Sequence, residues 1–253
     1  MKEIRVLIID DSSVVCSMLS RELSAYREIS AEGIPCDPYS ARNKIIEGGF
    51  DVLLLDIDMR KINGLALLKG IMKLVFVPVI VMSSLITPGN QTVVQALELG
   101  AVDAAYKPGG PFHVEETVSE LYRKIQEASV VPVWKLCAAA RRLNDFVRNK
   151  RTTEHVKPLN SAADNGLVVI GTSTGGVLAL EELLTGFSSV FPPVLVVTHM
   201  PAHFTAAFAR RLDRLYSFHV KEAEDGEKPV QGTVYLSPGG SSMSAARAGS
   251  GTV

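Results

Sequence analysis

The sequence predicts an α/β fold with two sheet-forming regions, and three observations lead to this prediction. Short runs of apolar, largely β-branched residues alternate with segments whose apolar residues recur at helical spacing. That alternation is typical of a parallel sheet covered by helices on both faces. The chain has 253 residues, 47% of them hydrophobic, and a polar stretch rich in structure-breaking residues divides it. We expect a first domain over residues 1–125, a linker over 126–165 and a second, doubly wound α/β domain over 166–253.

The first domain is expected to contain five strands and five helices. The strands are predicted at 4–9, 29–34, 51–55, 78–82 and 101–106, and the second is the weakest of them. The first helix follows the capping pair Ser12 and Ser13, and its apolar positions are Val15, Met18, Leu19 and Leu23. The other helices are predicted near 38–48, 64–74, 89–99 and 113–128. In a doubly wound sheet a ligand binds outside the carboxyl ends of the strands, where the strand order reverses.

Polar residues stand where the predicted strands of the first domain end. The first strand is followed by Asp10 and Asp11, the third by Asp56, the fourth by Ser83 and the fifth by Lys107. An acidic residue after a strand is common turn chemistry, so any one of these acids alone would indicate only a cap. Together they predict a site, because three carboxylates in one place repel one another unless a cation neutralises them. Oxygen ligands that leave room for water suit Mg²⁺.

The residues around these strand ends resemble the receiver domain of two-component response regulators. The resemblance lies in "LIIDDSS", "DVLLLDIDMRKINGL", "VIVMSS" and "KPGG" and covers about residues 1–125. It implies a flavodoxin-like five-stranded parallel sheet in which Asp56 accepts a phosphoryl group from a histidine kinase. It also implies that Asp10, Asp11 and Asp56 hold Mg²⁺ and that Ser83 and Lys107 bind the phosphoryl group. Metal and lysine would then neutralise the charge on the transferred group.

Two residues depart from the receiver pattern. Arg60 stands where a proline is usual, and Ala104 stands three positions before the lysine, where an aromatic switch residue is usual. Tyr106 is next to Lys107 and is expected to point to the opposite face of the strand. We therefore expect phosphorylation of Asp56 to survive more readily than its relay to the second domain.

The second domain opens with "VVIGTSTGG", in which an apolar strand runs into a turn that holds Ser173 between Gly171 and Gly175. A helix is expected directly afterwards, because apolar residues recur at helical spacing at Leu180, Leu183, Leu184 and Phe187. The glycine spacing fits neither a P-loop nor a dinucleotide-binding loop. Two interpretations remain on the pattern alone, the G-x-S-x-G elbow of a serine nucleophile and a structural corner.

A serine nucleophile needs a base to take its proton. The apolar strand 194–198 ends in His199, and parallel neighbouring strands would bring Ser173 and His199 to the same edge of the sheet. Backbone N–H groups after Ser173 could also stabilise developing negative charge. His203, in a turn region, and His219, at the start of an amphipathic segment, are less favoured as the base.

The combined pattern resembles the chemotaxis protein-glutamate methylesterases, the CheB family, over roughly residues 1–240. The motifs of the second domain that carry the resemblance are "VVIGTSTGG", "VVTHMPAHFTAAFARRLD", "VKEAEDGE" and "GTVYLSPGG". The resemblance implies hydrolysis of glutamate methyl esters on methyl-accepting chemotaxis receptors, with related deamidation of glutamine and no cofactor for the hydrolysis. Ser173 would be the nucleophile, His199 the base and Thr174 a donor to the oxyanion. The unphosphorylated receiver would cover this site, and phosphorylation of Asp56 would release it.

One part of that family pattern is missing from the sequence. The triad acid of these esterases belongs to a G-M-G-x-D-G motif located beyond residue 253, and the chain contains no such motif. We therefore expect a C-terminally truncated esterase domain with little activity, because losing the orienting acid lowers turnover about 10⁴-fold. Asp213, expected on a helix, and Asp225, expected in a turn, are poor replacements. The alternative function is an inert phosphoacceptor module of a two-component pathway, and nucleotide binding at the glycine turn is a distant third.

Composition indicates which classes of partner and which cellular compartment to expect. With 26 basic and 27 acidic residues the formal net charge is −1, which does not indicate binding to nucleic acid. Neither a signal peptide nor an apolar stretch of membrane-spanning length is present, so we expect a cytoplasmic protein without membrane insertion. Cys16, Cys36 and Cys137 fit neither a disulfide framework nor a zinc site. The basic residues between 141 and 151 are expected to form a solvated face of the linker.

Overall fold

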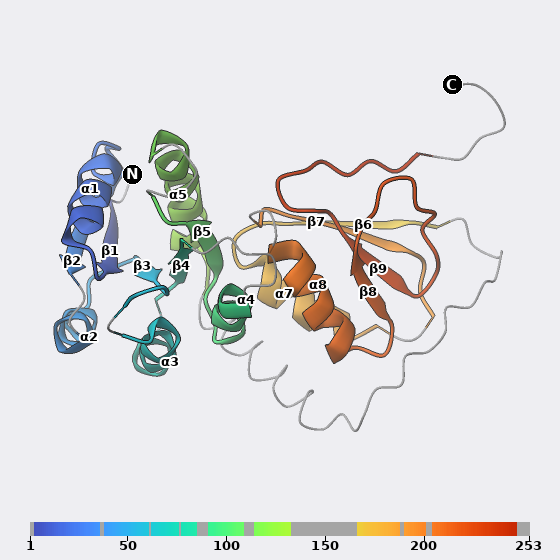
Figure 1. Cartoon of the computed structure of the whole chain (residues 1–253), viewed down its shortest axis with the longest axis horizontal. Helices are drawn as coiled ribbons and strands as arrows, with labels where there is room; N and C mark the ends of the chain where they lie inside the picture. Colours follow the sequence, from blue (N-terminus) through green and yellow to red (C-terminus); the bar gives the residue numbers. More distant parts are fainter. Residues whose placement is uncertain are drawn as a thin grey trace.

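Two parallel β-sheets with their covering helices make up the described part of the protein (Figure 1). The structure, a computed structural model, describes residues 3–35, 38–60, 62–75, 77–84, 91–108, 114–132, 166–187, 190–200 and 204–246. No helix within these ranges is long and apolar enough to cross a membrane. The expected linker and its basic residues lie almost wholly outside the described residues, as do Cys36, Cys137 and His203.

The first sheet has five parallel strands in the order β2-β1-β3-β4-β5, which confirms the predicted flavodoxin-like arrangement. Its strands are β1 (Ile4–Asp10), β2 (Ile29–Pro35), β3 (Val52–Asp56), β4 (Val79–Ser83) and β5 (Asp103–Tyr106). The fifth strand begins at Asp103, two residues later than expected, although Ala101 and Val102 before it are buried. The strand order reverses between β1 and β3, so the ends of these two strands lie at the switch point where ligands bind.

Five helices cover the two faces of the first sheet. They are α1 (Ser13–Leu23), α2 (Pro38–Glu47), α3 (Gly64–Leu74), α4 (Gln91–Glu98) and α5 (Val114–Ser129). Helices α1 and α5 share a core cluster on one face, and α2, α3 and α4 contribute to a second cluster on the other. Ser12 caps α1 by accepting a hydrogen bond from the Val15 N–H at 3.4 Å, which bears out the predicted helix start. Coverage on both faces explains why β3, β4 and β5 are buried along their whole lengths.

Helix α3 starts directly against the loop that follows β3, and only a glycine allows this approach. A Cβ atom at Gly64 would lie 2.5 Å from Ile57 Cα and 3.0 Å from the Asp56 carbonyl oxygen. Both neighbours are backbone atoms, so they cannot move aside as a flexible side chain would. The glycine therefore fixes the position of the backbone beside Asp56.

We expect Gly64→Ala to destabilise the protein by about 1–3 kcal/mol, because the added methyl group overpacks this junction. Gly70 provides a matched control in the same helix, since a Cβ atom there would meet no atom within 4 Å. Gly70→Ala should stabilise the helix by about 0.5–1 kcal/mol. Urea midpoints of the two variants measure both effects, and equal midpoints would contradict the close approach.

The second sheet has four parallel strands in the order β6-β7-β9-β8. The strands are β6 (Val168–Thr172), β7 (Val194–Thr198), β8 (His219–Glu222) and β9 (Thr233–Leu236), and the helices are α7 (Gly176–Leu184) and α8 (Phe204–Leu215). Strand β6 is at an edge of this sheet, and its Val168 and Val169 are exposed. The predicted strand-to-helix passage at Ser173 is therefore the connection between β6 and α7.

The two domains pack against each other through α4, α7, α8 and the end of β5 (Figure 1). One core cluster continues across the junction, and within it the Tyr106 ring stacks on the Phe204 ring of α8 at a centroid distance of 6.1 Å. Ala104 and Tyr106 belong to this cluster, whereas Ala105 belongs to the cluster on the other face of the sheet, as the alternation of side chains along a strand requires. Arg211 of α8 pairs with Glu98 of α4 and with the buried Glu181 of α7.

Candidate functional site

Three carboxylates converge at the ends of β1 and β3. Oxygen atoms of Asp10, Asp11 and Asp56 lie within 4.8 Å of one another, and Asp10 and Asp56 are fully buried. Backbone N–H groups fix their orientation, since Ser12 donates to Asp10 Oδ1 at 2.8 Å and Asp58 donates to Asp56 Oδ1 at 2.8 Å. The structure therefore brings together the acids that the sequence places at separate strand ends.

Lys107 joins two of these acids from the end of β5. Its Nζ lies 2.7 Å from Asp56 Oδ2 and 3.0 Å from Asp10 Oδ1. Burial is the largest influence on the pKa of Asp56 and raises it above its ordinary value, although the hydrogen bonds from Lys107 and the Asp58 N–H act in the opposite direction. Burial acts to lower the pKa of Lys107, but its hydrogen bonds to both acids outweigh burial and the pKa is raised. The three carboxylates of the cluster therefore carry more negative charge than the single positive charge of Lys107 neutralises.

The acidic cluster has the donor set of a magnesium site. Asp10 Oδ2 is buried, and its partner among the described residues is Lys107 Nζ at 2.8 Å, in an ion pair. Carboxylate oxygens at one edge of a sheet, together with water, are the ligands that Mg²⁺ takes. The residues present therefore fit a divalent cation held by Asp10, Asp11 and Asp56.

Ser83 contacts Asp58 and Arg60 contacts Asp11, two acids near Asp56, the candidate phosphoacceptor. The Ser83 hydroxyl donates to Asp58 Oδ2 at 2.7 Å, and the Ser84 N–H donates to the same oxygen at 2.7 Å. The Arg60 N–H donates to Asp11 Oδ2 at 3.0 Å, and its exposed guanidinium lies 3.6 Å from that oxygen. Asp58 is thus a residue that strand-end reasoning did not single out, although it stands two positions after Asp56.

Ser173 lies on the turn between β6 and α7. Gly175, which precedes the first helical residue, has a φ of 79°, in the left-handed region that favours glycine. Because β6 and β7 are paired in parallel, with Thr172 opposite Thr198, the next residues of both strands reach the same edge. Ser173 Oγ lies 3.2 Å from His199 Nδ1 there. The predicted pairing of serine and histidine is therefore present in the structure.

Helix α5 of the first domain contributes a carboxylate to this serine. Glu127 Oε2 accepts hydrogen bonds from Ser173 Oγ at 2.6 Å, from Thr174 Oγ1 at 2.7 Å and from the Thr174 N–H at 3.4 Å. The other oxygen, Oε1, accepts a hydrogen bond from Arg123 Nη1 at 2.6 Å. Partial burial would raise the pKa of Glu127, but the hydrogen bonds from Ser173, Thr174 and Arg123 outweigh it and lower the pKa to about 2. Glu127 is therefore ionised at neutral pH.

A buried ion pair from the first domain lies behind the same turn. Lys124 is fully buried and its Nζ lies 2.7 Å from Asp103 Oδ1, while it also donates to the His199 carbonyl oxygen at 3.3 Å. Asp103 Oδ2 in turn lies 2.7 Å from Thr174 Oγ1. Thr174 has one hydroxyl hydrogen and faces two carboxylates, so it donates to one of them at a time. The Gly175 N–H also donates to the carbonyl oxygen of Val102, the residue before β5, at 2.8 Å, which ties the turn to the first domain.

The other acids and histidines of the second domain lie elsewhere. Asp213 is on α8, as expected, where its Oδ1 accepts a hydrogen bond from the Val220 N–H and lies 3.8 Å from His219 Nδ1. Asp225 is exposed in a turn, also as expected. No carboxylate among the described residues is hydrogen-bonded to the ring of His199.

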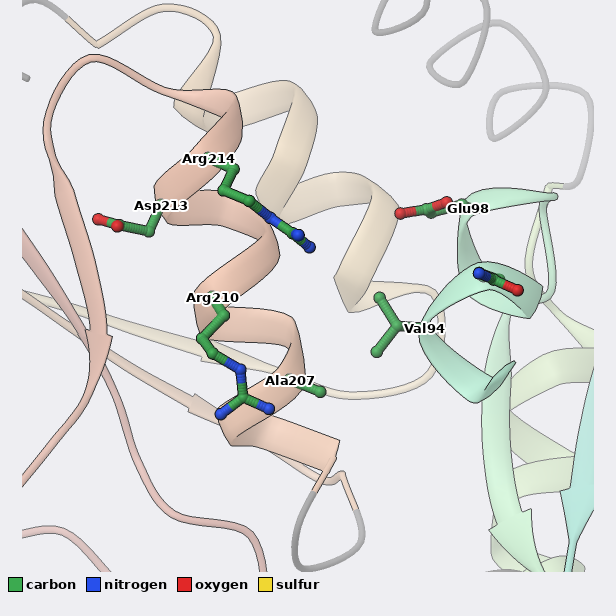
Figure 2. Close-up of a pocket in the computed structure, with 7 residues that line it drawn as sticks. Val94, Glu98, Ala207, Arg210, Asp213 and Arg214 are labelled. Carbon is green, nitrogen blue, oxygen red and sulfur yellow. The ribbon is translucent and has the colours of Figure 1, made fainter. Parts of the chain in front are cut away.

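A groove of about 420 Å³ runs along the contact between α4 and α8 (Figure 2). It is lined by Val94, Gln95 and Glu98 from α4 and by Ala207, Arg210, Asp213 and Arg214 from α8. Figure 2 shows Arg214 extending toward the α4 side of the groove and Asp213 pointing away from it. The acidic cluster of Asp10, Asp11 and Asp56 and the Ser173–His199 pair do not line this groove.

The residues around Ser173 that sequence reasoning missed all come from the first domain. Glu127, Arg123 and Lys124 lie on the helix predicted over 113–128, and Asp103 lies in the strand predicted over 101–106. Arg123 and Glu127 are four positions apart, a spacing typical of an exposed ion pair on a helix surface. The presence of a lysine among the apolar positions of the helix was the only local signal, since a lysine is rarely buried without a partner.

Comparison with known proteins gives a match for each domain. Residues 6–119 match the family described as response regulator receiver domain, and residues 168–252 match the family described as CheB methylesterase. Among solved structures, the response regulator domain of Thermotoga maritima CheB is 36% identical and covers 51% of this chain and 98% of its own, with a TM-score of 0.47.

Curated relatives match across both domains. A protein of Syntrophus aciditrophicus (strain SB), named protein-glutamate methylesterase/protein-glutamine glutaminase 2, is 38% identical over 256 residues, covering 98% of this chain and 71% of that protein. A protein of Caulobacter vibrioides, named protein-glutamate methylesterase/protein-glutamine glutaminase 1, is 38% identical over 240 residues, covering 95% and 67% respectively.

Proposed function

Because the chain belongs to the protein-glutamate methylesterase/protein-glutamine glutaminase family, carboxylic ester hydrolases, and has a receiver domain before its CheB domain, we propose that it is a phosphorylation-regulated esterase of chemotaxis. Its substrates would be methylated glutamate and glutamine side chains of methyl-accepting chemotaxis receptors, and its phosphoryl donor a chemotaxis histidine kinase in the cytoplasm. The observation that carries the proposal is the 3.2 Å approach of Ser173 Oγ to His199 Nδ1 beneath a receiver helix.

The chemistry proposed for the second domain is nucleophilic ester hydrolysis. Ser173 Oγ attacks the carbonyl carbon of the methyl ester, and its proton passes to His199. The Thr174 N–H and hydroxyl would stabilise the oxyanion. His199 then gives the proton to the leaving methoxide, so methanol departs, and water hydrolyses the acyl-enzyme to leave a glutamate side chain and free Ser173. Attack of the same serine on a glutamine side chain would release ammonia instead.

The receiver would act as the switch. Asp56 is the proposed phosphoacceptor, Lys107 and Ser83 the groups that bind the phosphoryl oxygens, and Asp10, Asp11 and Asp56 the residues that hold Mg²⁺. When bound, Mg²⁺ would neutralise charge on the transferring phosphoryl group. Ser83 would have to leave Asp58, to which its hydroxyl donates, before it can contact a phosphorylated Asp56.

The unphosphorylated conformation supports an autoinhibited state. The single hydrogen of the Ser173 hydroxyl is directed to Glu127, so it does not point to His199. Glu127 of α5 also lies 2.6 Å from Ser173 Oγ, so a substrate carbonyl would have to displace it to reach the serine. Release of α5 from the turn would therefore restore access and the hydrogen bond between nucleophile and base together.

A second candidate function has one observation in its favour. Because no carboxylate among the described residues orients the His199 ring, the chain is also consistent with a phosphoacceptor module whose second domain turns over slowly or not at all. Such a module would bind the kinase and accept phosphoryl groups without hydrolysing esters.

The test is methanol release from membranes that contain methyl-labelled receptor, with the protein in stoichiometric amount and with or without acetyl phosphate and Mg²⁺. We expect release that rises on phosphorylation and that is abolished by Ser173→Ala. Ser242→Ala, a change at an exposed serine, serves as the matched control and should leave release unchanged. Release that persists in Ser173→Ala would contradict the proposal, and phosphorylation without any release would favour the phosphoacceptor module.

A further inference from the structure

Glu127 meets the Ser173 turn in the way that the reaction product would. We infer that Ser173 Oγ, the Thr174 N–H and Thr174 Oγ1 form a subsite for the side-chain carboxylate of a helix-borne glutamate, and that Glu127 fills this subsite as an internal product mimic. The inference rests on the proposed function, since the product of that reaction is a glutamate side chain. The inference assigns a ligand class, glutamate side-chain carboxylates, to the subsite. It also explains how α5 binds the Ser173 turn, since Glu127 occupies the subsite.

The donors of the subsite are arranged for an anionic oxygen. Ser173 Oγ and the Thr174 N–H donate to one oxygen of Glu127 at 2.6 and 3.4 Å. Thr174 Oγ1 lies 2.7 Å from the same oxygen and donates its single hydrogen either to it or to Asp103 Oδ2. Hydrogen bonds to a charged acceptor are shorter and stronger than those between neutral groups. After hydrolysis the serine has regained its proton and the new carboxylate lies beside it, which is the contact that Ser173 makes with Glu127.

The helix presents Glu127 in a fixed conformation. Arg123, one turn earlier, holds Oε1 at 2.6 Å, which leaves Oε2 directed at Ser173 and Thr174. The buried Lys124, three residues earlier and on the same face of the helix, helps to fix the rotation of α5 by bonding Asp103 and the His199 carbonyl oxygen. A glutamate on a helix is therefore the ligand geometry that this subsite accommodates in the structure.

Side-chain length separates this subsite from a general anion site. An aspartate at position 127 would be shorter by one methylene group, about 1.5 Å. Added to the observed 2.6 Å, that difference places its carboxylate beyond hydrogen-bond distance of Ser173 Oγ. Glu127→Asp should therefore empty the subsite while keeping a negative charge on the helix.

Binding of a small glutamyl ligand tests the inference without any turnover. The probe is N-acetyl-L-glutamic acid α-amide, which has a free side-chain carboxylate, added to the ¹⁵N-labelled 253-residue chain while the Thr174 amide resonance is followed by NMR. In Glu127→Ala and Glu127→Asp we expect a saturable shift of this resonance. In the unchanged protein and in Glu116→Ala, a matched change at an exposed position of the same helix, the internal carboxylate competes and binding should be at least about tenfold weaker.

Two comparisons locate the ligand. The aspartyl analogue of the probe should shift the Thr174 resonance only weakly, and adding Ser173→Ala to Glu127→Ala should weaken glutamyl binding about tenfold, since one charge-assisted hydrogen bond is lost. A folded Glu127→Ala protein that shows no saturable shift, or equal binding in the unchanged protein, would overturn the inference. If Glu127→Ala binds the glutamyl probe as expected but the unchanged protein releases no methanol from methylated receptor, the result would count against the proposed function and not against the subsite.

Discussion

Replacing Asp56 by asparagine is expected to abolish phosphoryl labelling of the protein by acetyl phosphate and Mg²⁺. In the labelling step a carboxylate oxygen of Asp56 forms a bond to phosphorus and acetate leaves, and an amide cannot act as this nucleophile. Asp56 is fully buried at the switch point, with Asp10 and Asp11 within 4.8 Å and Lys107 Nζ at 2.7 Å. Intact-protein mass after a short incubation measures the label.

The control for this change lies at the other end of the same strand. Asp51 accepts a hydrogen bond from the Arg5 N–H at 2.9 Å and takes no part in the acidic cluster, so Asp51→Asn should label as the unchanged protein does. Chelation of Mg²⁺ should slow labelling of the unchanged protein and of Asp51→Asn, because the three carboxylates then repel the incoming phosphoryl group. Labelling of Asp56→Asn at the level of Asp51→Asn would show that the phosphoacceptor is another residue.

Removal of the charge of Asp103 is expected to destabilise the protein by about 3–5 kcal/mol, because it leaves a buried lysine without its principal partner. Lys124 is fully buried, and its Nζ lies 2.7 Å from Asp103 Oδ1. Glu120 lies 3.6 Å from the same Nζ and offsets part of the loss. Asp103→Asn keeps the size of the side chain, so the urea midpoint of this variant reports the lost charge rather than a cavity.

A double-mutant cycle separates the ion pair from the rest of the site. Lys124→Met removes the buried charge, and the variant with both changes should be more stable than Asp103→Asn alone. Glu116→Gln, an exposed change of the same type on α5, should alter stability by less than about 0.5 kcal/mol. If Asp103→Asn unfolds at the same urea concentration as the unchanged protein, Lys124 must have another sufficient partner.

Local patterns were enough to predict the first sheet and the candidate residues at its edge. Apolar runs marked β1, β3 and β4 within one or two residues, because strands covered on both faces tolerate few polar side chains. The acids follow from the same logic, since the carboxyl ends of parallel strands meet at one edge. The start of β5 was predicted two residues early, because Ala101 and Val102 are buried although they do not belong to the strand.

The contact between Ser173 and His199 was also predictable, and for a similar reason. Each residue follows an apolar strand, and the parallel pairing of β6 with β7 brings both to one edge. Apart from the pairing of these two strands, neither residue needs information from the rest of the chain for its position. The direction of the Ser173 hydroxyl, by contrast, depends on Glu127, which is 46 residues earlier in the sequence.

By itself, the sequence determined the two α/β units, the acidic cluster and the serine–histidine pair, because these depend on periodicity and on residues next to strand ends. Only the tertiary structure decided which face of α5 meets the second domain. The helical pattern of α5 identifies an apolar face, but it predicts that an i,i+4 ion pair such as Arg123–Glu127 lies on the solvent-exposed face. Docking of the domains through Lys124, Asp103 and the Tyr106–Phe204 contact turns that pair toward Ser173. Contacts between residues so far apart in the chain are selected by the shape and charge of two folded surfaces, which no local pattern encodes.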